Sequence, residues 1–340
     1  MVGQRVLSRA SQHLTMVMVV LAATGFARGA EPKSLKLVQT IELKGGPGRL
    51  DHMAIDQKHG RLFVANLSNN SLDIVDLKAG KLAKQIPDQK KLQGIAYAPD
   101  LDRIFVGNGI SGNCNVFDGK DYKLLKSIPL LDADNVRYNP KTHLVYIEHA
   151  EQSLSVFDAR NYETKATIKL PGSPEAFQLE ASRPRLYVNA LPNHVVVIDT
   201  DKNEVLHKYP LKLAERGYPM AIDEKNHRLF IGCREKPVVL VMDSETGKAI
   251  TTVLIPADID DLFYDAKRKR LYASCGEGFL TILKQRDADN YEILEKIPTV
   301  KLARTCFFDS ETGRLYLGIP RQEGKEGPEI QVYEAINKDN

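Results

Sequence analysis

Residues 61–76 read RLFVANLSNNSLDIVD, and the rest of the chain repeats this unit. The apolar run 62–64 is followed by polar residues at 68–70 and by a second apolar run at 72–75. Short runs rich in β-branched and aromatic residues on either side of a polar turn are typical of a β-hairpin. The stretch therefore predicts two neighbouring strands of an antiparallel sheet.

Six further copies of the first half of this unit follow along the chain. They are RIFV at Arg103, LVYI at Leu144, RLYV at Arg185, RLFI at Arg228, RLYA at Arg270 and RLYL at Arg314. With His143 aligned to the arginines, successive copies are 42, 40, 42, 43, 42 and 44 residues apart. A period of this length made of short strands indicates a β-propeller blade. Helix-pair repeats share the period, but the short apolar runs and the many Gly, Pro and Asn residues exclude them.

The repeats also predict how many blades the ring has and how it closes. The fourth repeat indicates an inner, a second, a third and an outer strand at 176–179, 186–189, 194–198 and 204–209. The seventh repeat has only three strands, at 305–308, 315–318 and 329–333. Residues 35–43, LKLVQTIEL, look like the missing outer strand. We therefore expect an all-β, seven-bladed propeller of four-stranded antiparallel blades, closed by the N-terminal strand, which hides exposed sheet edges.

Several segments resemble the YVTN family of β-propeller repeats. The matching segments are RLYVN at 185–189, VVID at 196–199, GIAYAPD at 94–100 and IPL at 128–130. The resemblance covers nearly all of residues 35–336 and departs most after Leu283 and in the loop 320–328. It implies a propeller in an extracytoplasmic setting. It implies no catalytic residue, because the repeat motif is structural and the functions found on this fold are diverse.

The first thirty residues are expected to be a secretory signal peptide. Arg5 and Arg9 precede the apolar run 14–23, and small residues follow at 25–30. That run is shorter than the roughly 20 apolar residues of a membrane span, although an uncleaved anchor is the alternative. We expect residues 31–340 to form one domain, a monomer that is periplasmic or secreted and has no membrane span after cleavage.

The charge balance gives no support to binding of nucleic acid. The chain has 47 basic and 44 acidic residues, and the leader carries three arginines, Arg5, Arg9 and Arg28, without an acid. Its removal leaves equal numbers of basic and acidic residues. Without a basic excess there is no general field to attract a polyanion.

Four cysteines are too few for a disulfide scaffold in a chain that can bury a large core. Bridges between Cys275 and Cys306 or between Cys233 and Cys275 are open alternatives. Buried free thiols, with Cys114 as the fourth, are the favoured interpretation.

Candidate site residues lie where inner strands begin and second strands end, because both points meet at one face of the central channel. Equivalent positions diverge there, whereas the strand motifs stay uniform, as expected of a site carried by a scaffold. The candidate ligand-binding residues are Asp51, His52, Asp134, Glu148, His149, Glu175, Tyr218, Arg234, Asp260, Asp261 and Arg304.

Three interpretations of this face remain open on the sequence. The favoured one is a non-catalytic binding scaffold for a protein, a polymer or a small ligand. The alternative is a hydrolase of a small ester or lactone that uses a His–Asp pair and, if present, a divalent metal. The residues that would offer nitrogen and oxygen ligands to Zn²⁺, Ca²⁺ or Mn²⁺ are His52, Asp134, Glu148 and Asp261. The third interpretation is a solvated mouth whose charges only pair with one another.

Overall fold

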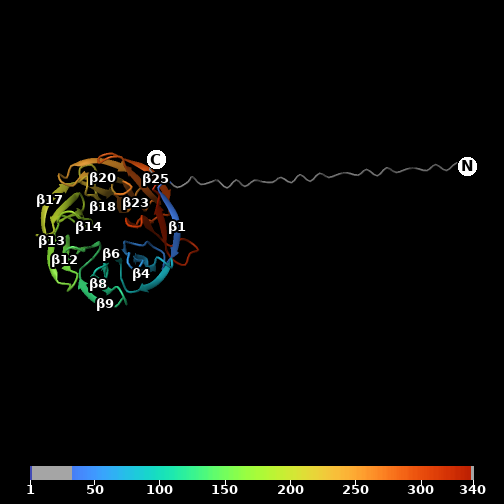
Figure 1. Cartoon of the computed structure of the whole chain (residues 1–340), viewed down its shortest axis with the longest axis horizontal. Coiled ribbons are helices and arrows are strands. Elements are labelled where there is room, and N and C mark those ends of the chain that lie inside the picture. The colour runs from blue at the N-terminus through green and yellow to red at the C-terminus, as the bar shows by residue number, and fades with distance from the viewer. Residues whose placement is uncertain (2–32, 338–340) are drawn as a thin grey trace. The chain divides into compact units, whose positions relative to one another are not determined.

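A computed structural model describes Met1 and residues 33–337; the predicted signal peptide lies outside the described residues, apart from Met1. Seven four-stranded antiparallel sheets lie around a central channel (Figure 1). This confirms the predicted all-β propeller with seven blades. In the described part of the chain, no helix is long and apolar enough to cross a membrane.

The first four blades each use four consecutive strands, running from the channel outward. Their strands are β2 (Met53–Asp56), β3 (Arg61–Asn66), β4 (Ser71–Asp76) and β5 (Lys81–Ile86); β6 (Leu92–Ala98), β7 (Arg103–Asn108), β8 (Asn113–Asp118) and β9 (Leu124–Pro129); β10 (Val136–Asn139), β11 (Leu144–His149), β12 (Ser153–Asp158) and β13 (Thr164–Lys169); β14 (Pro174–Leu179), β15 (Arg185–Ala190), β16 (His194–Asp199) and β17 (Glu204–Pro210). A single 3-10 turn, η1 (Leu67–Asn69), joins β3 to β4.

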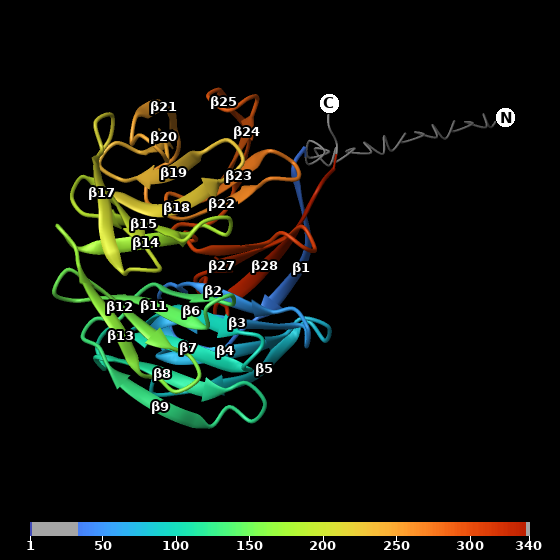
Figure 2. The ribbon, with the colours of Figure 1, turned by 60° about the vertical axis from the view of Figure 1, so that its left-hand side comes forward.

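The fifth and sixth blades follow the same order, and the seventh borrows a strand. Their strands are β18 (Gly217–Asp223), β19 (Arg228–Cys233), β20 (Val238–Asp243) and β21 (Ala249–Leu254); β22 (Ile259–Asp265), β23 (Arg270–Cys275), β24 (Phe279–Gln285) and β25 (Tyr291–Pro298); β26 (Cys306–Asp309), β27 (Arg314–Ile319), β28 (Glu329–Ala335) and β1 (Leu35–Glu42). Figure 2 shows β1 beside β28, with the first and last parts of the ring in contact.

The N-terminal strand closes the ring as the repeat pattern predicts. β1 pairs antiparallel with β28 from Leu35 opposite Ala335 to Glu42 opposite Glu329. Leu35 and Ile41 are fully buried. The backbone N–H of Ser34 also donates to the carboxylate of Glu295 in blade six at 2.9 Å. The first residues of the domain therefore hold two blades together.

The repeated residues have structural roles that explain their recurrence. In blade five, Arg228 lies opposite Asp243 and forms an ion pair with it at 2.8 Å. The same aspartate accepts the backbone N–H of Glu245 and Thr246 and so forms the turn into the outer strand. We call the first residue of each copied motif, such as Arg61, its anchor. Two residues after each anchor stands a buried aromatic side chain that fills the space between blades. These are Phe63, Phe105, Tyr146, Tyr187, Phe230, Tyr272 and Tyr316.

The structure corrects the alignment of the third blade by one residue. Leu144, not His143, takes the place of the anchor arginines, because Leu144 pairs with Asp158 as Arg61 pairs with Asp76. His143 instead lies in the preceding turn, with a positive φ of 56°. Since side chains alternate between the faces of a strand, this one-residue shift changes which side chains of blade three face the channel.

All four cysteines are buried and free. Burial raises the pKa of Cys114 and Cys233 to about 12, which keeps these thiols protonated and unreactive. We therefore expect a thiol reagent to label none of the four in the folded protein and all four after denaturation without reductant. Mass spectrometry of the labelled chain measures the number; fewer than four labels in the denatured protein would reveal a bridge.

Candidate functional site

Seven side chains form a ring at the mouth of the channel, one from the start of each blade. With blade three realigned, the equivalent residues are Asp51, Gln93, Asp134, Glu175, Tyr218, Asp260 and Arg304. All seven line one cavity of about 170 Å³. We call these residues the mouth ring. Six of them, all but Gln93, are ionisable residues that the sequence predicts at this face.

A second cavity of about 360 Å³ lies along the channel next to the first and shares His52 and Ala176 with it. Three residues after each mouth-ring position, the inner strands contribute a further ring to this channel cavity. We call it the channel ring; its members are Ala54, Ala96, Arg137, Gln178, Ala221, Phe263 and Phe307. His52 therefore lies at the boundary between a charged mouth and a largely apolar channel.

The mouth charges form a connected network on one side of the ring. Arg49 lies 2.6 Å from Asp51 and 3.6 Å from Asp260. Arg304 contacts Asp260 through Nε at 2.8 Å and Asp258 through Nη1 at 2.6 Å. The pairs of Arg49 and Arg304 with Asp260 cross between blades, so they fix the relative position of the strand ends that surround the mouth.

Arg234 and Tyr218 extend this network. Arg234 forms a close ion pair with Asp260, and its guanidinium carbon lies 3.8 Å from the centre of the Tyr218 ring. Such a stack of a cation on an aromatic face restricts both side chains. The exposed faces of the pair border the mouth cavity.

His52 and Asp261 form an ion pair at the boundary of the two cavities. His52 Nδ1 lies 3.2 Å from Asp261, which also accepts the backbone N–H of Cys306 at 2.9 Å. Burial acts to lower the pKa of His52, but the charge and hydrogen bond of Asp261 outweigh it and raise the pKa to about 10. His52 is therefore protonated at neutral pH, and the pair connects blades one, six and seven.

Several mouth carboxyl groups hold their protons more tightly than usual. Burial raises the pKa of Asp51 to about 7, although His52 and Arg49 oppose the shift. Burial, with the charge of Asp134, raises the pKa of Glu175 to about 8. Burial also raises the pKa of Asp134 itself. Near neutral pH the mouth thus carries less negative charge than its acids suggest.

Glu175 makes the stability of the protein depend on pH. Its carboxyl group keeps its proton in the folded state up to about pH 8, whereas the unfolded chain releases it near 4.5. The free energy of unfolding therefore falls as pH rises through this window, by about 2 kcal/mol after allowance for solvent at the open mouth. As the pH rises from about 4.5 to about 8, the free energy of unfolding of Glu175→Gln should therefore increase by about 2 kcal/mol relative to that of the wild type.

Urea denaturation at a series of pH values measures this difference. Glu204→Gln serves as the control, because Glu204 is exposed on the outer strand β17 and should give a pH-independent difference. If the stability difference between Glu175→Gln and the wild type does not change with pH, the pKa of Glu175 is not raised in the folded protein.

Two predicted site residues lie apart from both cavities. Glu148 is buried behind the mouth and accepts the side-chain amide of Asn135 at 2.8 Å. Burial and the nearby charge of Asp134 raise its pKa well above the usual value. His149 points into its own blade, where Nε2 lies 2.9 Å from Ser155 Oγ. Successive residues of a strand face opposite sides, so the two cannot act at one site.

The four predicted metal ligands do not converge. His52 and Asp261 contact each other, while Asp134 accepts a hydrogen bond from Gln93 and Glu148 is hydrogen bonded to Asn135. Among the described residues, no group of three or more His, Cys, Asp and Glu side chains is arranged to hold a metal ion.

Sequence reasoning did not identify Arg49, Arg137 and Gln178 as cavity residues. Arg49 lies in the connection before the first inner strand, outside the repeated positions. Arg137 and Gln178 are members of the channel ring, where the other blades have Ala or Phe. A comparison of inner strands in the correct register would have revealed both, because they are the only polar residues in that ring.

The fold and the two cavities define a seven-bladed β-propeller with a charged mouth and a mainly apolar channel. No family model matches the chain. The chain is similar to a protein of Salmonella typhimurium (strain LT2) described as "Uncharacterized protein YncE", with 22% identity over 310 residues that cover 84% of this chain and 86% of that protein. The protein of Escherichia coli (strain K12) with the same description is 23% identical over 236 residues, which cover 62% of this chain and 66% of the relative. These similarities assign no function to the chain.

Proposed function

We propose that this protein is an exported, non-catalytic β-propeller that binds a small polar ligand in its central channel. The observation that carries the proposal is the mouth ring. Seven structurally equivalent positions hold acidic, basic, amide and phenolic side chains around a cavity, while the equivalent core positions hold only Phe or Tyr. Structural repetition accounts for the core but not for this variety.

Some polar groups at the mouth lack hydrogen-bond partners. This favours ligand binding over a mouth whose charges only pair with one another. Among the described residues, the Glu175 side chain has no hydrogen bond or ion pair, and the buried Oε1 of Gln93 has no hydrogen-bond partner. Buried polar atoms normally have hydrogen-bond partners, and a bound molecule would supply the missing ones. The channel cavity of about 360 Å³ lies in the size range of small-ligand pockets, which favours a small ligand over a protein or polymer.

The hydrolase alternative gains no support from this geometry. A general base must be unprotonated near the working pH, but the pKa of His52 is raised to about 10 by Asp261. The export of the protein is part of the proposal and is supported by the order of charged, apolar and small residues in the first thirty positions.

Thermal denaturation in the presence of a set of small sugars, amino acids and organic acids tests the proposal. We expect at least one compound to raise the melting temperature of the wild type, because binding to the folded state alone stabilises it. The increase should be lost in Arg234→Gln and Glu175→Gln. It should persist in Lys208→Gln, which alters an exposed residue of β17. No stabilising compound, or equal stabilisation of all three variants, would overturn the proposal.

A further inference from the structure

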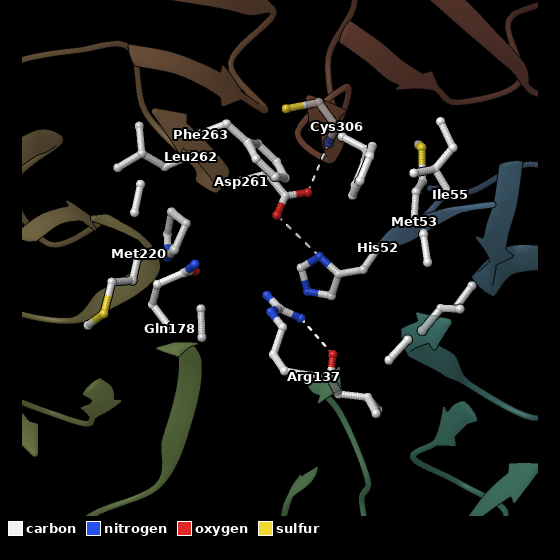
Figure 3. A pocket seen from close by; sticks show the side chains of 18 of the residues that line it. His52, Met53, Ile55, Arg137, Gln178, Met220, Asp261, Leu262, Phe263 and Cys306 are labelled. Carbon is white, nitrogen blue, oxygen red and sulfur yellow. Dashed lines mark hydrogen bonds and ion pairs between the residues drawn. The ribbon is translucent and has the colours of Figure 1, made fainter. Parts of the chain in front are cut away.

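Arg137 is the only charged member of the channel ring. The equivalent residues of the other blades are Ala, Gln or Phe, so the guanidinium stands in an otherwise uncharged layer of the channel. Arg137 comes from β10, and Figure 3 shows its side chain directed into the cavity toward His52.

The guanidinium of Arg137 has few partners for its position. It donates to the backbone oxygen of Val136 at 2.9 Å and to Oδ1 of Asn135 at 3.2 Å. Among the described residues, no carboxylate lies within ion-pair distance of it. An arginine side chain has five N–H donors, so most of them remain available. Arg137 is half-buried, and its guanidinium carbon lies 5.6 Å from the centre of the Phe177 ring. A partly desolvated charge without a counter-ion is costly, so this position favours an anionic partner.

The groups that face Arg137 do not supply that counter-ion. Asp261 is paired with protonated His52, and burial raises the pKa of both Glu148 and Asp134, which favours their neutral forms. The His52–Asp261 pair is neutral overall, so it leaves the charge of Arg137 uncompensated. An uncompensated cation directed into a cavity favours an anionic ligand there.

The remainder of the cavity is suited to the body of an organic anion. Phe263 and Phe307 form an aromatic wall, with ring centres 5.7 Å apart and planes at 68°. Gln178 points into the cavity with no hydrogen bond from its side chain to any other described residue (Figure 3). The site therefore combines a cation, an amide and an apolar surface.

We propose that the channel cavity binds a small organic carboxylate whose carboxylate group pairs with Arg137 and whose apolar body packs against Phe263 and Phe307. Arginine suits this role because its planar fork can donate two parallel hydrogen bonds to a carboxylate. The inference rests on the proposed function and specifies the chemical class of its ligand.

Benzoate and benzamide are matched probes for this site, because they differ in charge and hardly in shape. In isothermal titration calorimetry we expect benzoate to bind the wild-type protein at least about tenfold more tightly than benzamide, the effect of one charge-assisted hydrogen bond. Arg137→Met should remove this preference. Lys208→Gln, on the exposed outer strand, should retain it.

Melting temperatures show whether a variant that loses benzoate binding is still folded. Removal of an unpaired, half-buried charge should leave the melting temperature of Arg137→Met equal to or above that of the wild type, and Arg137→Gln provides a second, polar replacement. No benzoate binding at millimolar concentration, equal affinity for the two probes, or unchanged preference in both variants would overturn the inference. A neutral compound whose binding requires Arg234 and Glu175 but not Arg137 would overturn it while the proposed function stands.

Discussion

A chain that starts at residue 44, and so lacks β1, is expected to lose most of its stability. Leu35, Ile41 and Leu43 are buried to at least 97% in the last blade, and burial of a Leu or Ile side chain contributes about 1.5–3 kcal/mol. Their loss amounts to about 5 kcal/mol or more, which is comparable with the whole stability of many domains. β28 would also become an exposed edge strand, which promotes aggregation.

Urea denaturation of this variant, compared with a chain that starts at residue 31, measures the effect. Point variants separate the contribution of β1 from the truncation itself. Ile41→Asp places a charge in the core and should be nearly as harmful, whereas Thr40→Asp alters the exposed neighbour and should have little effect. If the truncated and longer chains unfold at the same urea concentration, β1 does not close the ring.

Asp261→Ala is expected to destabilise the protein by about 3 kcal/mol near neutral pH, because it leaves the largely buried His52 cation with only the more distant Asp51, 3.9 Å away. The backbone N–H of Cys306 would lose its acceptor as well. Asp258→Ala is the matched control. Asp258 also pairs with an arginine at the mouth, but 32% of its side chain is exposed, so its removal should cost less than about 1 kcal/mol.

The pH dependence of this effect identifies its cause. The pKa of His52 is raised from 6.5 to about 10 in the folded protein, so the stabilisation is complete below pH 6.5 and disappears as pH rises toward 10. The stability difference between the wild type and Asp261→Ala should therefore shrink over this range in urea denaturation. A difference that is constant with pH would show that the ion pair is not its source.

The fold was predictable because its main determinants are local and repeated. The strand motif at Arg61 recurs in all seven blades because each copy supplies a buried aromatic side chain. The aspartate that ends the third strand of the first five blades recurs because it accepts backbone N–H groups of the following turn. The missing strand of the seventh blade and the unassigned strand at 35–42 are also visible in the sequence. A closed ring then follows from the need to pair the last sheet edge.

The candidate site was predictable only in part. The positions of His52, Glu175 and Arg304 at the channel mouth follow from counting along the repeats. The count failed in blade three, where the sequence aligns His143 with the anchor arginines although Leu144 is the structurally equivalent residue. Burial of Tyr146 between the blades sets the true register, and no single-residue signal reveals such a packing constraint.

The sequence by itself determined the number of blades, the order of their strands and the face at which unlike residues gather, because these depend on periodicity and local pairing. Only the tertiary structure decided which charges meet. It pairs His52 with Asp261, turns His149 away from the channel and, within the part of the chain that the structure describes, places no carboxylate within ion-pair distance of Arg137. Such distances depend on how blades from distant parts of the chain are packed around the channel, and pairing between them sets both the protonation states and the chemistry of the cavity.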